Sequence, residues 1–272
     1  MTARSTEVET MIRAALRAAE SLRADFARPE SLDVREKAAS DFVSNADLRA
    51  QAILRADLSA AFPEHGLTLE EGDDRAAARG APRFIVDPLD GTTNFVHGIP
   101  HFAVSVAREV DGVIVAGTVV DAATGEVFWA ERDHGAWLGE RRLRVSSEHR
   151  LDHSVIGTGI PHHARGDHPP YLEALASIMR DVAGIRRLGS AALDLAYVAA
   201  GRFEAFFETG LAAWDVAAGA LLVREAGGVV TRTDGVVEHL SGDVLAAAHM
   251  SLHADLVGRL APLHRGSAAA RR

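Results

Sequence analysis

The sequence contains no cysteine among its 272 residues. Disulfide bonds and catalysis by a cysteine thiolate are therefore excluded, and the composition suits a reducing compartment. Long apolar runs are also missing, because Arg108, Glu109 and Asp111 interrupt the most apolar region, residues 102–123. The N-terminus lacks the apolar core of a signal peptide. We therefore expect a cytoplasmic protein that has no membrane partner.

Positive charge is in deficit. The 29 lysine and arginine residues stand against 38 aspartates and glutamates, which gives a net charge of −9. This balance argues against direct binding to nucleic acid. An acidic protein can still bind phosphate if bound cations invert the local field. The hydrophobic fraction of 47% is ordinary for a globular protein and sufficient for a full core.

The hydrophobic pattern predicts a mixed α/β (α+β) chain. Between residues 102 and 145, short β-rich runs alternate with turn signals, which is typical of an antiparallel meander. Helical spacing and strand-like runs predict the other elements: helices near 8–22, 46–62, 171–182, 190–201, 215–225 and 252–260, and a strand over 203–207. We expect a single domain over 1–272, divisible into subdomains at about 1–150 and 151–262, with a frayed tail at 263–272.

One short segment, residues 84–95, carries the strongest functional signal. It reads F-I-V-D-P-L-D-G-T-T-N-F. Its apolar start predicts a buried strand that ends in Asp87, and Asp90 follows close enough to share a hard cation. Pro88 suits the first position of a helical turn. If a helix begins near Thr93, its free N–H groups face the carboxylates, as an anion site requires. The combination predicts a metal-dependent enzyme that acts on phosphate.

A second segment, residues 214–219, reads W-D-V-A-A-G and opens an amphipathic run. By itself, Asp215 is best interpreted as an acid that caps a helix. Together, however, the two segments resemble the paired signatures of the inositol monophosphatase family, roughly D-P-[IL]-D-G-T-x-N-F and W-D-x-A-A-G. The resemblance covers about residues 6–262 and is to the bacterial inositol-1-phosphatase-like branch.

The resemblance implies a fold and a metal site. The fold is a single catalytic domain built as an α-β-α-β-α layered sandwich, the inositol monophosphatase and fructose-bisphosphatase type. The implied ligands are four carboxylates and one backbone carbonyl: Glu70, Asp87, Asp90, Asp215 and the carbonyl of Leu89. Oxygen ligands of this kind select Mg²⁺, about two or three ions, or Mn²⁺, rather than zinc.

The same resemblance assigns catalytic roles to Glu70, Thr92 and Asp47, which together position the attacking water. Without it, the run that contains Glu70 is a solvated acidic loop, and Asp47 is an acid in the first turn of a helix. Leu69 stands where the family has glycine, so the backbone of this loop is a point of departure. Ser44 is a milder departure, since the family favours threonine there.

Substrate contacts are implied on both sides of the phosphate ester. Backbone N–H groups of Gly91 and Thr92 hold the phosphate, beside the carboxylates of Asp90 and Asp215. The alcohol lies along Gly189, Ser190 and Ala191, and Glu208 accepts from its hydroxyl groups. A carboxylate at this position would equally attract an ammonium group.

The function implied is a Mg²⁺-dependent phosphomonoesterase that hydrolyses inositol-1-phosphate to inositol and phosphate by a metal-activated water. The family also implies a homodimer and a small phosphate monoester as substrate. Two alternatives keep the fold and change the alcohol: a histidinol-phosphate phosphatase, or a sugar-phosphate phosphatase acting on fructose-1,6-bisphosphate. An alternative of another class is a regulatory protein-binding role with vestigial activity.

Overall fold

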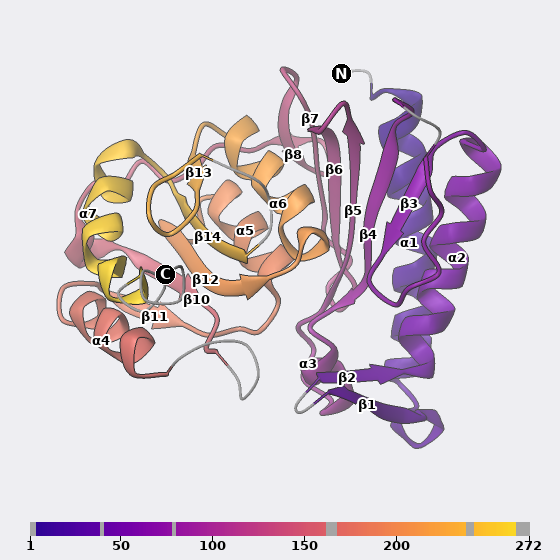
Figure 1. The fold of residues 1–272 in the computed structure, drawn as a ribbon, viewed down its shortest axis with the longest axis horizontal. Helices are drawn as coiled ribbons and strands as arrows, with labels where there is room; N and C mark the ends of the chain where they lie inside the picture. Colours follow the sequence, from indigo (N-terminus) through magenta and orange to yellow (C-terminus); the bar gives the residue numbers. More distant parts are fainter. Residues whose placement is uncertain (1–3, 39–40, 78–79, 162–167, 238–241, 265–272) are drawn as a thin grey trace, which may run out of the picture.

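Two β-sheets alternate with three layers of helices in the computed structural model, which describes residues 4–38, 41–77, 80–161, 168–237 and 242–264 (Figure 1). Their order confirms the expected α-β-α-β-α sandwich. The tail predicted at 263–272 lies outside the described residues from residue 265 onward. In the part of the chain that the structure describes, no helix combines the length and apolar character needed to cross a membrane.

The first sheet has seven strands in sequence order. Its strands β3 and β4 are parallel, and every later neighbour is antiparallel, which confirms the predicted meander. The strands are β3 (Gly66–Leu69), β4 (Arg83–Asp90), β5 (Ala103–Val110), β6 (Val113–Asp121), β7 (Val127–Glu131), β8 (Gly135–Leu138) and β9 (Arg141–Arg142).

The second sheet has five strands in the order β11-β10-β12-β14-β13. Strand β10 pairs in parallel with both neighbours, whereas β14 is antiparallel to β12 and β13. The strands are β10 (Val155–Thr158), β11 (Gly184–Arg186), β12 (Ala205–Leu211), β13 (Val229–Thr231) and β14 (Gly242–Ala247). A separate hairpin, β1 (Val34–Ala38) and β2 (Asp41–Ser44), precedes the first sheet along the chain.

Three buried clusters hold the layers together. Helices α1 (Thr6–Phe26) and α2 (Asn45–Ala61) cover the outer face of the first sheet. Helices α5 (Ala191–Ala199) and α6 (Ala213–Glu225) lie between the two sheets, and α4 (His168–Met179) and α7 (Met250–Leu260) cover the outer face of the second. Short helices complete the chain: α3 (Thr92–Val96), and 3₁₀ turns at Pro29–Ser31, Leu151–His153 and Ala261–His264.

Strand β4 directs the first functional segment toward the middle layer. Successive side chains of a strand point to opposite faces. Phe84 and Val86 accordingly pack with α1 and α2, whereas Ile85 packs with the cluster around α5 and α6. Asp87 follows the same alternation as Ile85 and therefore faces α6.

The structure corrects the prediction for Pro88. This residue lies inside β4 instead of beginning a helical turn. The pairing of β4 with β5 shifts between Asp87 and Asp90, so the strand carries a bulge there. Proline is tolerated at a bulge because the extra residue makes no ladder hydrogen bond. The bulge, and not a turn, brings the two carboxylates together.

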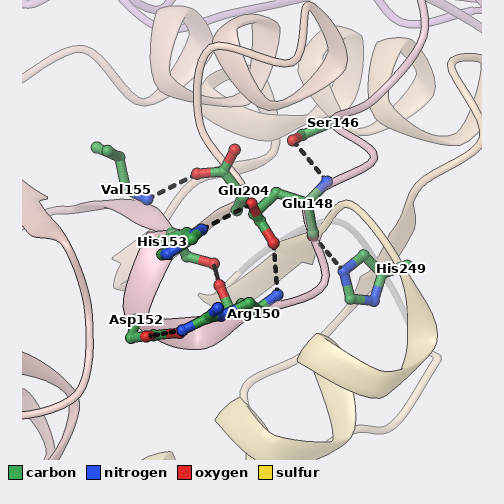
Figure 2. A network of polar contacts seen from close by, with 9 residues as sticks. Ser146, Glu148, Arg150, Asp152, His153, Val155, Glu204 and His249 are labelled. Atoms are coloured by element: carbon green, nitrogen blue, oxygen red, sulfur yellow. Dashed lines mark hydrogen bonds and ion pairs between the residues drawn. The ribbon is translucent and has the colours of Figure 1, made fainter.

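The segment between the sheets is fixed by local polar contacts (Figure 2). The backbone N–H of Arg150 and the ring of His153 both contact the Glu148 carboxylate, at 2.8 and 3.2 Å. His249, the N-cap of α7, contacts the Glu148 carbonyl oxygen at 2.7 Å. The Glu204 carboxylate accepts from the Val155 N–H at 2.6 Å, where the second sheet begins. These contacts connect residues 148–153, which lie between the two sheets in the sequence, to α7 and β10.

Glycine in the second functional segment has a packing role. A Cβ on Gly219 would lie 2.5 Å from the Leu195 Cβ, so α5 and α6 can approach this closely only without a side chain there. Gly258 in α7 is also helical, but a Cβ there would meet no atom within 4 Å. Substitutions at these two glycines therefore distinguish the effect of a packing clash from the effect of backbone entropy in the unfolded chain.

We expect alanine to have opposite effects at these two glycines. Gly219→Ala should lower the free energy of unfolding by about 1–3 kcal/mol through overpacking. Gly258→Ala should raise it by about 0.4–1 kcal/mol, because alanine restricts the unfolded chain. Urea unfolding of both variants measures the difference. A Gly219→Ala protein as stable as the Gly258→Ala protein would contradict the close packing of α5 on α6.

Candidate active site

Three carboxylates meet where β4 ends and α6 begins. One oxygen from each of Asp87, Asp90 and Asp215 lies within 4.8 Å of the others. Asp87 is buried, and the other two are half-buried. Three oxygen donors this close, taken from two rigid elements, fit a hard divalent cation. The structure thus brings together three of the four carboxylates predicted as ligands.

Burial and mutual repulsion make this cluster unfavourable without a cation. Burial, followed by the charges of Glu70, Asp90 and Asp215, raises the pKa of Asp87 well above its ordinary value. Burial and the charge of Asp90 likewise raise the pKa of Asp215. The pKa of Asp90 is raised to about 6, chiefly by burial. A bound dication would relieve both the desolvation and the repulsion.

Asp90 is held by the start of α5. Its Oδ2 accepts from the Ser190 hydroxyl at 2.5 Å and from the Ala192 N–H at 2.8 Å. These hydrogen bonds partly offset the rise in the pKa of Asp90. Ser190 is also the N-cap of α5, because its side chain accepts from the Leu193 N–H. The hydroxyl predicted to contact substrate therefore already bonds to a predicted metal ligand.

Asp215 is oriented in a comparable way by α6. It is the third residue of the helix, and its Oδ2 accepts from the Ala212 N–H at 2.6 Å. Asp87 Oδ1 accepts from the Leu89 N–H at 2.9 Å. Each carboxylate thus uses one oxygen for a backbone hydrogen bond, which fixes the direction of the other. The interpretation of Asp215 as a helix-capping acid is correct, and the same residue belongs to the cluster.

Thr92 and Asp47 lie in contact, as the resemblance predicted. The Thr92 hydroxyl is 3.2 Å from Asp47 Oδ1 and 3.0 Å from the Leu89 carbonyl oxygen. Asp47 Oδ2 accepts from the N–H and the hydroxyl of Ser44, at 2.9 and 2.5 Å, and so forms the capping box of α2. Burial raises the pKa of Asp47 despite these bonds. Asp47 is therefore both a helix-cap acid and the partner of Thr92.

Glu70 approaches the cluster from the end of β3. Its charge contributes to the raised pKa values of Asp87 and Asp90. Leu69, which replaces a family glycine, is a buried strand residue with no left-handed backbone. The loop that follows is held by Gln51, which accepts from the Glu71 N–H at 3.1 Å. The leucine therefore fits without a special conformation.

Gly91 lies where the end of β4 closely approaches the residues just before α5. It has φ of 92°, and a Cβ there would lie 3.0 Å from the His101 carbonyl oxygen and 3.2 Å from that of Gly189. Asn94 donates at 2.8 Å to the carbonyl oxygens of both His101 and Leu188. Helix α3 begins at Thr92, one residue before the predicted start. These contacts place residues 188–192 beside the carboxylates.

Comparison with known proteins agrees with this geometry. The model of the inositol monophosphatase family matches residues 4–264. This chain belongs to the inositol monophosphatase family. It is 54% identical over 233 residues to an inositol-1-monophosphatase of Rhizobium meliloti, covering 86% of this chain and 88% of the relative. It is 40% identical over 236 residues to the Nus factor SuhB of Escherichia coli K12, with the same shares covered.

Solved structures give the same result. The extragenic suppressor protein suhB of Bartonella henselae superposes with a TM-score of 0.91 at 46% identity, covering 94% of this chain and 98% of that one. An inositol monophosphatase of Thermotoga maritima has a TM-score of 0.85 at 30% identity, covering 95% and 98%. The family is metal-dependent, and the three aspartates are a cluster that could bind the metal.

Two residues near Glu208 were not singled out from the sequence for this site. A Cβ on Gly159 would lie 1.8 Å from the Glu208 Cδ, so glycine makes room for this carboxylate. Asp194 is 1% exposed, and its Oδ1 has no hydrogen-bond partner in the described part of the chain. Burial, with the charges of Glu208 and Asp90, raises its pKa well above the ordinary value. The only sequence signal was an acid within an otherwise apolar helical run, residues 191–199.

We expect the metal-free protein to lose stability as the pH rises. The folded pKa of Asp90, about 6, exceeds the ordinary value of 3.8, so ionising this group opposes folding. The penalty is absent below the ordinary value and grows as the pH rises toward the folded pKa. Urea unfolding in chelator, at about pH 4.5 and about pH 7, should show Asp90→Asn gaining stability relative to wild type. A difference independent of pH would contradict the account.

Proposed function

We propose that this chain hydrolyses inositol-1-phosphate to inositol and inorganic phosphate. The observation that carries the proposal is the cluster of Asp87, Asp90 and Asp215, backed by the contact between Thr92 and Asp47. The inositol-1-monophosphatase that is 54% identical supports the choice of substrate. The presence of all four predicted carboxylates in the sequence favours an active enzyme over a vestigial one.

The proposed cofactor is Mg²⁺, about two or three ions, with Mn²⁺ as a substitute. Glu70, Asp87, Asp90, Asp215 and the carbonyl of Leu89 would hold it. When bound, a dication of this kind supplies Lewis-acid stabilisation of the charge that develops on the phosphate. The carboxylates contribute fixed negative charge and directed lone pairs, which suit a hard cation better than a soft one.

The proposed catalytic residues orient a water molecule for in-line attack. The Thr92 hydroxyl has a single proton, and both of its observed partners, Asp47 Oδ1 and the Leu89 carbonyl, are acceptors. When it donates to either, its lone pairs can accept from the attacking water. Glu70, whose charge also contributes to the raised pKa of Asp47, would receive the proton. The N–H groups of Gly91 and Thr92 are proposed to hold the phosphate oxygens.

The alcohol is proposed to lie along Gly189, Ser190 and Ala191 and to meet Glu208. Burial and the charge of Glu208 raise the pKa of Asp194, so these two acids lie near one another. Hydrogen-bond acceptors of this kind suit a polyol. They would also attract an ammonium group, so histidinol phosphate remains an alternative substrate, beside fructose-1,6-bisphosphate. The inferred location is cytoplasmic, and a homodimer is inferred from the family.

A second candidate function is regulatory binding to a protein partner. It is favoured by the relatives named Nus factor SuhB, which are 40–42% identical to this chain. In that case Asp90→Asn would abolish phosphate release and leave the cellular role intact.

Phosphate release from a substrate panel tests the proposed activity. We expect inositol-1-phosphate to be hydrolysed with Mg²⁺, and neither histidinol phosphate nor fructose-1,6-bisphosphate at a comparable rate. Chelation should abolish the activity. Asp215→Asn should lower kcat by about 100-fold or more, since even outer partners of metal ligands are worth about 10–100-fold. Preference for histidinol phosphate would transfer the assignment to that substrate, and near-normal turnover by Asp215→Asn would refute the site.

The role of Thr92 can be tested with a matched pair of substitutions. Thr92→Ser keeps the hydroxyl that contacts Asp47, whereas Thr92→Val keeps the shape and removes the hydroxyl. We expect Thr92→Val to lower kcat by about 100-fold with little change in KM, because misplacing the attacking water costs about that much. Thr92→Ser should retain most of the activity. A larger loss in Thr92→Ser than in Thr92→Val would show that the methyl group, not the hydroxyl, matters, and equal losses would contradict a specific role of the hydroxyl.

A further inference from the structure

A cavity of about 750 Å³ lies apart from the carboxylate cluster, between the first sheet and α6. Its apolar wall consists of Ile85, Ile114 and Leu221, each less than a tenth exposed. Three guanidinium groups line it as well, those of Arg83, Arg132 and Arg224. The volume is that of a small-molecule site, and an apolar wall with a few charged groups is the usual character of such sites.

Two of the acidic residues around the cavity already accept hydrogen bonds from the protein. Glu109 forms two hydrogen bonds with Arg83, at 2.8 and 3.1 Å, so this pair is neutral overall. The two carboxylate oxygens of Glu225 accept backbone N–H groups of Asp133 and Gly135, at 2.9 and 2.8 Å. The three carboxylates that line the cavity, including Asp133, balance its three arginines in formal charge, but only Arg83 has a carboxylate in hydrogen-bonded contact.

Arg132 and Arg224 are the two arginines of the cavity that make no hydrogen bond to a carboxylate among the described residues. Arg224 donates to the Val230 carbonyl oxygen at 3.4 Å, and no ion pair of Arg224 with a carboxylate is found in the part of the chain that the structure describes. The nearest acid to Arg132 is Asp133, at 3.9 Å, and the Asp133 side chain is 88% exposed. Burial and the charge of Arg132 lower the pKa of Arg224, so the two guanidinium groups repel one another. Both remain charged at neutral pH.

We propose that this cavity binds a small organic anion whose phosphate, sulfonate or carboxylate group lies between Arg132 and Arg224. Paired guanidinium groups beside an apolar wall match an anionic head on an aromatic or aliphatic body. An anion would remove the repulsion between the two arginines, as a bound dication would for the carboxylate cluster.

The cavity touches the same two elements that carry the carboxylate cluster. Ile85 and Ala213 line it, and each stands two residues before a member of the cluster, Asp87 in β4 and Asp215 in α6. None of the cluster's own residues lines the cavity. The anion site is therefore separate from the metal site. A ligand in the cavity would contact β4 and α6, the two elements that position the carboxylates.

The probe that tests the proposal is 8-anilinonaphthalene-1-sulfonate, which joins a sulfonate to an aromatic body. Its fluorescence is titrated on the folded, full-length protein in chelator, so the result does not depend on catalysis. We expect saturable binding that Arg132→Gln and Arg224→Gln each weaken by about tenfold or more, the usual loss for a hydrogen bond to a charged group. Arg132 is 54% exposed, so its variant should fold even if Arg224→Gln does not.

A matched control comes from a second arginine-lined cavity, on α1. It contains Arg13 beside Ile12 and Leu16, so Arg13→Gln removes a cation from a similar surface. We expect this variant to bind the probe like wild type. Weaker binding by Arg13→Gln with unchanged binding by Arg132→Gln would overturn the proposal, as would the absence of saturable binding by the wild-type protein.

Discussion

The mutual repulsion of three close carboxylates is the constraint on which the rest of this structure depends. Asp87, Asp90 and Asp215 are partly or fully buried, and one oxygen of each lies within 4.8 Å of the others. Such a cluster opposes folding unless something positive joins it. The fold therefore holds the carboxylates in place and leaves a bound cation to supply the compensation.

The architecture explains how the three carboxylates are held close together despite their repulsion. The bulge in β4 lets two acids of one strand point the same way, and the first turn of α6 adds the third. Asn94 and Gly91 then tie this end of the first sheet to residues 188–192 of the second half. Each carboxylate is fixed by a hydrogen bond from a neighbouring backbone N–H, so its orientation does not depend on the ion.

Much of this was predictable from the sequence, because the periodic signals were strong. The helices α1, α2 and α6 and the antiparallel meander follow hydrophobic spacing, and the carboxylate motif is specific. Pro88 was misplaced because a proline after a carboxylate suits a helix start as well as a bulge, and only the pairing with β5 distinguishes them. The hydrophobic spacing likewise gave no order for the layers.

Contacts between distant segments were predicted only where the family motifs include them, as for Thr92 with Asp47. The space that Gly159 leaves for Glu208, the bond from Ser190 to Asp90 and the arginine-lined cavity all join residues about 50 or more positions apart. Local propensity carries no information on such contacts. Asp194 shows the same limit, since its spacing on α5 predicts burial but not the neighbouring acids.

Calorimetric titration of Mg²⁺ into chelator-stripped protein tests the central claim most directly. We expect saturable binding by the wild-type protein, weakened by about tenfold or more in Asp90→Asn and in Asp87→Asn. Asp133→Asn, which removes an exposed acid far from the cluster in the sequence, should bind Mg²⁺ like wild type. Unchanged Mg²⁺ affinity in both cluster variants would contradict the claim that these carboxylates form the cation site.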